Sequence, residues 1–256
     1  MEADQYPPGT PCWVDVASPD LDASVAFYRA LFGWDAAAVE LDGGDYRVFE
    51  LGGKTVGGIR SVDDADALPL WRAYVSVDDA SATANAVRDA GGRVVVEPYD
   101  VRDQGRLALC ADGAGATFGV WQAGANPGAQ LCIEPGTFCW IELACRDVDA
   151  AKAFYGAVFG WNGTTTPLEG TSYTEFDAGG SSVAGMILMS ELWPPDMPAH
   201  WMVYFAVDDC DVVADHAHRL GGRVAVPPTD IEPGRFAVVN DPQGNTFSII
   251  AMRPVG

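Results

Sequence analysis

Residues 9–34 read GTPCWVDVASPDLDASVAFYRALFGW, and residues 136–161 read GTFCWIELACRDVDAAKAFYGAVFGW. Fifteen of these 26 positions are identical, at a constant offset of 127 residues. Each copy is a short alternating strand, then an Asp, then an amphipathic helix that ends at Gly-Trp. Self-similarity at a fixed spacing indicates a duplicated supersecondary unit. The sequence therefore predicts two equivalent halves.

The segments after each repeated unit are short, alternate in hydrophobicity and are separated by paired glycines, which is typical of strands joined by tight turns. In the first half, strands are expected near residues 36–41, 45–51 and 54–60. A second round follows, with strands near 71–77, 93–97, 105–111 and 117–122 and a helix near 80–90. The second half repeats that round, with strands near 201–207, 223–226, 235–240 and 246–251.

The pattern predicts an α+β protein of four βαβββ modules, which form two tandem domains with concave mixed sheets. The first domain is expected over residues 1–125 and the second over 135–256. A linker that contains Asn-Pro-Gly is expected over 126–134.

Composition narrows the class of protein. The 256 residues are 48% hydrophobic and 20% charged, as in a packed globular chain. The net charge of −21 and the scattered Lys and Arg residues exclude an ordinary nucleic-acid or anionic-membrane partner. The sequence does not open on a basic segment followed by an apolar core, and it has no apolar run of the roughly 20 residues that span a bilayer, so we expect neither a signal peptide nor a membrane-spanning helix. With six cysteines and no C-x-x-C spacing, we expect a cytoplasmic protein with reduced thiols.

Alternation also assigns the two faces of each strand. The apolar face is expected to pack against the helices, and the opposite face mixes indole, phenol, carboxylate and guanidinium groups. Such a mixture is typical of a ligand cavity, which needs apolar walls and a few placed polar groups. The candidate cavity residues are Trp13, Asp15, Arg72, Tyr74 and Trp121 in the first half and Trp140, Glu142, His200, Met202 and Tyr204 in the second.

Four motifs carry a resemblance to a known family. They are the Asp-x-x-x-(Ala/Ser)-x-x-Phe-Tyr-x-x-x-Phe-Gly-Trp helix, Val-Asp-Asp after the fifth strand, Gly-Gly-x-Val, and the Asp-Pro-x-Gly-Asn hairpin. The chain resembles the vicinal oxygen chelate superfamily, which includes glyoxalase I, extradiol dioxygenases and bleomycin resistance proteins. It is most similar to two-domain actinobacterial members described as glyoxalase-like or hydroxylase. The resemblance covers nearly the whole chain.

The resemblance also implies where metal ligands would lie. The family's first-strand His falls on Trp13 and Trp140, and its fifth-strand His falls on Arg72 and Met202. The last-strand Glu falls on Gly119 and Ser248. Imidazole is a favoured ligand for zinc, iron and nickel, and none of the residues at these six positions replaces it as a ligand. The expectation is therefore a protein with no metal site and no other cofactor.

Two acidic positions are candidates for proton transfer. Asp15 and Glu142 are equivalent in the repeat, and a carboxylate desolvated against Trp has a raised pKa and can act as a general acid or base. The alternative is a structural partner for an arginine such as Arg72. His200 could form an acid–base pair with Glu142, or it is a loop histidine with an ordinary hydrogen bond.

The aromatic positions leave a similar choice. Tyr74 and Tyr204 are equivalent, as are Trp13 and Trp140. These rings either stack on a flat ligand or fill the cavity themselves.

Three functional hypotheses follow. The first is a metal-free binding protein or accessory enzyme, hydroxylase-like or isomerase-like, for a flat apolar or aromatic small molecule in secondary metabolism or resistance. The second is a metal-dependent glyoxalase or dioxygenase built from Glu142, His200 and nearby carboxylates. The third is a non-catalytic interaction protein with filled cavities. The sequence identifies neither the ligand nor the reaction, and it leaves open which cavity functions. A monomer or a weak homodimer is expected.

Overall fold

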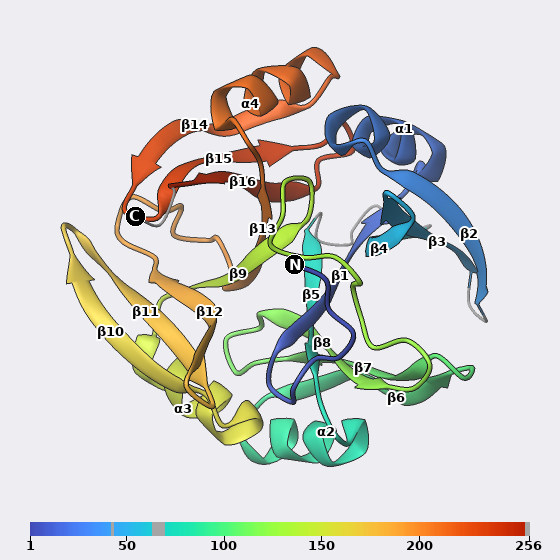
Figure 1. Ribbon diagram of the computed structural model, residues 1–256. Helices are drawn as coiled ribbons and strands as arrows, with labels where there is room; N and C mark the ends of the chain where they lie inside the picture. The colour runs from blue at the N-terminus through green and yellow to red at the C-terminus, as the bar shows by residue number, and fades with distance from the viewer. Residues whose placement is uncertain (42–43, 63–69, 254–256) are drawn as a thin grey trace.

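The computed structural model describes residues 1–41, 44–62 and 70–253, and two mixed sheets of eight strands lie within them (Figure 1). The first sheet has the order β2-β3-β4-β1-β5-β8-β7-β6 and the second the order β10-β11-β12-β9-β13-β16-β15-β14. The first sheet consists of β1 (Pro11–Ser18), β2 (Asp35–Leu41), β3 (Gly44–Leu51), β4 (Lys54–Ser61), β5 (Trp71–Ser76), β6 (Arg93–Val101), β7 (Gly105–Ala111) and β8 (Thr117–Ala123). The second consists of β9 (Phe138–Cys145), β10 (Asn162–Leu168), β11 (Thr171–Ala178), β12 (Ser181–Leu188), β13 (His200–Ala206), β14 (Arg223–Ile231), β15 (Gly234–Asn240) and β16 (Thr246–Met252).

Each sheet joins two βαβββ modules through their first strands. β1 pairs with β5 antiparallel, and β9 pairs with β13 in the same way. Within the modules, β1 pairs with β4 and β5 pairs with β8 in parallel. The predicted α+β architecture of four modules in two tandem concave units is confirmed.

The helices begin and end where the repeated motif predicts. They are α1 (Leu21–Phe32), α2 (Ala80–Asp89), α3 (Val148–Phe159) and α4 (Cys210–Arg219). Asp20 and Asp147 are the N-caps of α1 and α3, because each carboxylate accepts a hydrogen bond from a first-turn backbone N–H. Gly33 and Gly160 end these helices in the left-handed region, with φ of 76° and 71°, which glycine adopts at little cost.

The helices pack on the strands of their own half and also contact the other half. In Figure 1, α1 lies beside α4 and α3 lies beside α2. The Tyr28 ring of α1 lies 5.9 Å from that of Phe247 in β16, and the Tyr155 ring of α3 lies 5.8 Å from that of Phe118 in β8. The sheets also meet directly, since Trp71 of β5 and Phe205 of β13 are in edge contact at 4.9 Å.

Polar contacts in this shared core follow the repeat as well. The Tyr28 hydroxyl donates to Asp241 at 2.9 Å, and the Tyr155 hydroxyl donates to Asp112 at 3.0 Å. Trp34 donates from Nε1 to the Gly136 carbonyl at 2.7 Å. The motif Phe-Tyr…Gly-Trp therefore both caps its own helix and binds the opposite half.

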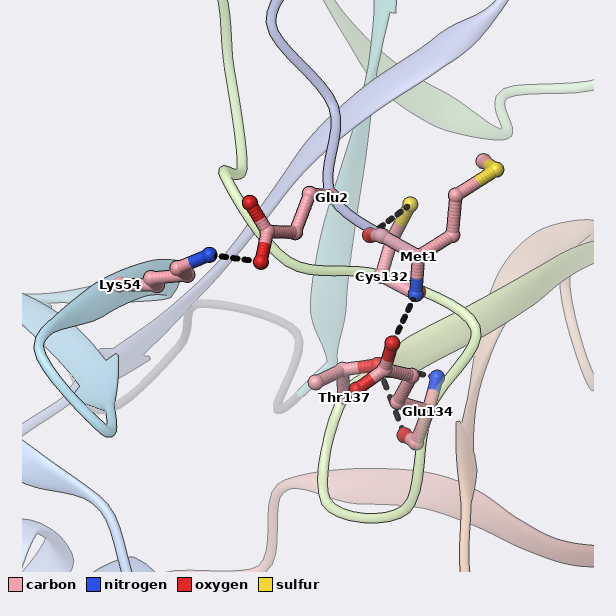
Figure 2. Close-up of polar contacts among 6 residues, drawn as sticks. All are labelled: Met1, Glu2, Lys54, Cys132, Glu134 and Thr137. Carbon is pink, nitrogen blue, oxygen red and sulfur yellow. Dashed lines mark hydrogen bonds and ion pairs between the residues drawn. The ribbon is translucent and has the colours of Figure 1, made fainter.

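The N-terminal segment lies along the region predicted as a linker (Figure 2). The Met1 ammonium group is 2.6 Å from a carboxylate oxygen of Glu134, and Glu2 forms an ion pair with Lys54. The Tyr6 hydroxyl donates to the Ala129 carbonyl at 2.7 Å. Residues 129–134 are thus held between the N-terminal segment and β4.

Strands β6 and β14 are longer than the sequence pattern predicts. Each continues through a proline, Pro98 in β6 and Pro227 in β14, although proline has no N–H to donate to a sheet. Both strands lie at a sheet edge and carry register shifts near these prolines. An edge strand tolerates proline because one row of its N–H groups has no partner strand.

None of the helices within the described ranges is long and apolar enough to cross a membrane.

We expect Tyr28→Phe to lower the free energy of unfolding by about 1–3 kcal/mol, because buried Asp241 loses a donor and the Trp71 indole N–H loses its acceptor. Urea unfolding measures the change. Tyr99→Phe, which removes a half-exposed hydroxyl, is the control and should cost less than about 0.5 kcal/mol. Equal stabilities for Tyr28→Phe and the control would contradict a role for this contact in joining the halves.

Candidate functional site

A cavity of about 600 Å³ occupies the concave face of the first sheet. Its walls come from both modules of the first half and from residues 125–128 and Gln130. All five first-half residues predicted from alternation line it, namely Trp13, Asp15, Arg72, Tyr74 and Trp121. They meet because the β1–β5 register places Trp13 opposite Tyr74 and Asp15 opposite Arg72.

A polar network lies at the floor of this cavity. The Tyr74 hydroxyl donates to Asp15 Oδ2 at 2.7 Å. Arg72 Nη1 is 3.9 Å from Asp15 Oδ1 and donates to the Tyr74 hydroxyl at 3.3 Å. Asp15 is only 4% exposed, so it depends on these partners. The geometry favours the structural-partner alternative for Asp15 over that of an isolated acid or base.

Burial, followed by the charge of Asp15, raises the pKa of Tyr74 well above its usual value. Its hydroxyl therefore stays protonated and acts as a hydrogen-bond donor to Asp15 at neutral pH.

Tyr46 and its repeat counterpart Tyr173 belong to the two concave faces and were missed from the sequence. Trp13 Nε1 donates to the Tyr46 hydroxyl at 3.0 Å, and Trp140 Nε1 donates to the Tyr173 hydroxyl at the same distance. A Cβ on Gly58 would lie 2.0 Å from the Tyr46 hydroxyl oxygen, so glycine leaves the room for this phenol. The same offset of 127 relates both tyrosines, and comparing the halves position by position would have found the pair.

The second concave face has a different charge pattern. The Tyr204 hydroxyl donates to Glu142 Oε1 at 3.0 Å, and Met202 lies opposite Glu142 where the first half has Arg72. Burial raises the pKa of Glu142 to about 7, opposed by hydrogen bonds from Tyr204 and Tyr173. Without an arginine, this carboxyl group changes charge near neutral pH.

His200 does not pair with Glu142 in the part of the chain that the structure describes. Its Nδ1 lies 2.9 Å from the Pro198 carbonyl oxygen, and its ring is 6.2 Å from that of Trp193. In the sheet, His200 lies opposite Ala144, two residues beyond Glu142. These contacts agree with the alternative of a loop histidine that makes an ordinary hydrogen bond, because the imidazole contacts Pro198 in the segment that leads into β13.

Comparison with known proteins gives the same family from both halves. The family model of the Glyoxalase/Bleomycin resistance protein/Dioxygenase superfamily matches residues 12–120 and again residues 137–249. A protein of Mycobacterium tuberculosis named "Putative glyoxylase CFP32" is 40% identical over 257 residues, covering 98% of this chain and 97% of its own. The anthracycline biosynthesis protein DnrV of Streptomyces peucetius is 38% identical over 264 residues, covering 97% and 95%.

Solved structures share the fold at low identity. The Mn(II)-bound glyoxalase from Novosphingobium aromaticivorans aligns with a TM-score of 0.65 at 20% identity, covering 95% of this chain and 82% of its own. The extradiol ring-cleaving dioxygenase from B. fuscum aligns with a TM-score of 0.67 at 16% identity, covering 98% and 74%. The chain belongs to the glyoxalase/bleomycin resistance/dioxygenase superfamily, also called the vicinal oxygen chelate superfamily.

The side chains at the family's metal positions do not fit a divalent ion. An indole N–H, as in Trp13, is a donor only, and the Arg72 guanidinium is a permanent cation. A Cβ on Gly119 would lie 2.0 Å from the Tyr74 ring, so no carboxylate side chain fits there without displacing Tyr74. Across residues 1–41, 44–62 and 70–253, no group of three His, Cys, Asp or Glu side chains could hold a metal.

Glu142→Gln should remove a pH-dependent loss of stability. The folded-state pKa of Glu142, about 7, exceeds its usual 4.5, so the stability contributed by the protonated form is complete below about pH 4.5 and is lost as pH rises to about 7. The loss amounts to at most about 3 kcal/mol. Urea unfolding should show that the free energy of unfolding falls more between pH 5 and pH 8 for the native chain than for Glu142→Gln. Exposed Glu175→Gln is the control, and a decline in Glu142→Gln as large as that of the native chain would contradict the assignment.

Proposed function

We propose that this member of the superfamily binds a flat aromatic small molecule in the first-half cavity, without a resident metal ion, as a binding protein or an accessory enzyme. The observation that carries the proposal is the aromatic-walled cavity of about 600 Å³, whose floor holds Asp15, Arg72 and Tyr74. Two of its lining residues, Trp13 and Arg72, stand at positions where the family resemblance places metal ligands. Ligand cavities of small molecules commonly measure roughly 300–1,000 Å³.

The aromatic walls support a planar ligand. Trp13, Tyr74 and Trp121 line the cavity from three neighbouring strands, and Tyr99 lies at its edge with about half of its surface exposed. The indole N–H groups of Trp13 and Trp121 are already bonded to Tyr46 and to the Asn126 carbonyl. The rings are thereby fixed in orientation, and their faces and edges supply apolar contact at little entropic cost.

The relatives support a polycyclic ligand. The name of DnrV places that protein in anthracycline biosynthesis, and anthracyclines are fused-ring aromatic compounds. A cavity of this size and lining accommodates such a ring system. The third hypothesis, of filled cavities, does not account for the open volume in the first half.

Leu107 lines the same cavity, and Phe236 of β15 occupies the corresponding strand position in the second half. We expect Leu107→Trp to weaken binding of the neutral probe 2-naphthamide by about tenfold, because the larger side chain fills the cavity. Isothermal titration calorimetry measures the affinity. Phe236→Trp is the matched control and should bind as the native chain does. No binding of 2-naphthamide to the native chain, or equal effects of the two variants, would contradict the proposal.

Removal of metal ions should leave binding unchanged. Elemental analysis of the purified protein is expected to find far less than one Mn, Fe, Ni or Zn per chain. The affinity for 2-naphthamide should be equal with and without a chelator, because the residues at the family's metal positions are not ligands. About one tightly held ion per chain would instead support the metal-dependent glyoxalase or dioxygenase hypothesis.

A further inference from the structure

Arginines gather at the first cavity of a chain whose net charge is −21. Arg60, Arg72 and Arg102 all line it. In the second half, Met202 takes the place of Arg72, and Ile187 takes the place of Arg60 in the register, since Ile187 lies opposite Tyr173 as Arg60 lies opposite Tyr46. The positive charges therefore belong to one concave face and not to the fold in general.

Arg72 has unused hydrogen-bond donors. A guanidinium group carries five N–H donors, and Arg72 uses only Nη1, toward Tyr74 and Asp15. Among the described residues, the only fully buried side-chain nitrogen or oxygen without a partner is Ser248 Oγ. Nε and Nη2 of Arg72 are therefore accessible, and since this side chain is only 20% exposed and lines the cavity, they are open to the cavity.

Arg60 contributes a second positive charge. It lies on β4, while Arg72 lies on β5, and both strands flank β1 in the sheet. Within residues 1–41, 44–62 and 70–253, Arg60 forms no ion pair with a carboxylate. Its guanidinium group thus retains its capacity to bind an acceptor at the cavity.

The acidic residues of the cavity are largely engaged. Asp15 is buried and accepts from Tyr74, and Asp100 pairs with Arg106 at 2.6 Å. Asp45 is exposed at the edge. The unused polar capacity at the floor therefore consists of donors with positive charge, which selects an anionic acceptor rather than a cation.

We propose that the ligand is an aromatic carboxylate, whose carboxylate group accepts hydrogen bonds from Arg72 and is attracted by Arg60 while its ring lies against Trp13, Tyr74 or Trp121. This inference rests on the proposed function, because it names the chemical class that the same cavity takes.

The test compares 2-naphthoate with the uncharged isostere 2-naphthamide by calorimetry in about 50 mM salt, where charges are weakly screened. The native chain should bind 2-naphthoate about tenfold more tightly. Arg72→Met and Arg60→Ile should lose this preference, so that the ratio of the two affinities falls to about one. Both substitutions copy residues that the second half carries at these positions. Arg29→Met, on the exposed face of α1, is the control and should keep the preference.

The outcomes separate the two proposals. Equal affinities of the native chain for the two probes would overturn the carboxylate proposal and leave the aromatic cavity intact, whereas binding of neither probe would overturn both. If Arg72→Met does not fold, the carboxylate proposal is tested by Arg60→Ile and by the salt dependence of 2-naphthoate binding. Raising salt from about 50 to about 500 mM should weaken 2-naphthoate binding and not 2-naphthamide binding, and an unchanged affinity for 2-naphthoate would contradict the proposal.

Discussion

The antiparallel pairing of β1 with β5, repeated by β9 with β13, is the constraint on which the rest of the molecule depends. It sets Val14 against Ala73 on the helix side and Asp15 against Arg72 on the concave side. Since side chains alternate along a strand, a slip of one residue would exchange these two faces. One register therefore fixes both the hydrophobic core behind the sheet and the polar network at the floor of the cavity.

Duplication has kept this constraint and let the two concave faces diverge. Tyr28 and Tyr155 still cross between the halves, so each half completes the core of the other. The concave faces differ where the core does not constrain them. The first couples Asp15 to an arginine, whereas the second leaves Glu142 with neutral tyrosines and a pKa near 7. A shared core thus explains why the chain retains both halves although their sites differ in chemistry.

Much of the fold could be predicted because the repeat reveals the two equivalent halves, and the period-two alternation reveals the strands and which side chains share a face. Alternation also placed Trp13, Asp15, Arg72, Tyr74 and Trp121 on one face. Hydrogen bonds depend on which strands become neighbours, and alternation carries no information about that. Tyr46 was missed because its strand, β3, is separated by β4 from β1, which carries Trp13. The pairing of His200 with Glu142 failed for a similar reason, since the approach segment turns the imidazole toward the Pro198 carbonyl.

A crystal structure of the chain grown with 2-naphthoate, with anomalous scattering recorded for transition metals, tests the central claim most directly. We expect density for one ligand in the first-half cavity, with its carboxylate at Arg72 and its ring against Trp13, Tyr74 or Trp121, and no anomalous peak there. A transition metal held beside Glu142 or Asp15, or a first cavity closed by its own side chains, would contradict it.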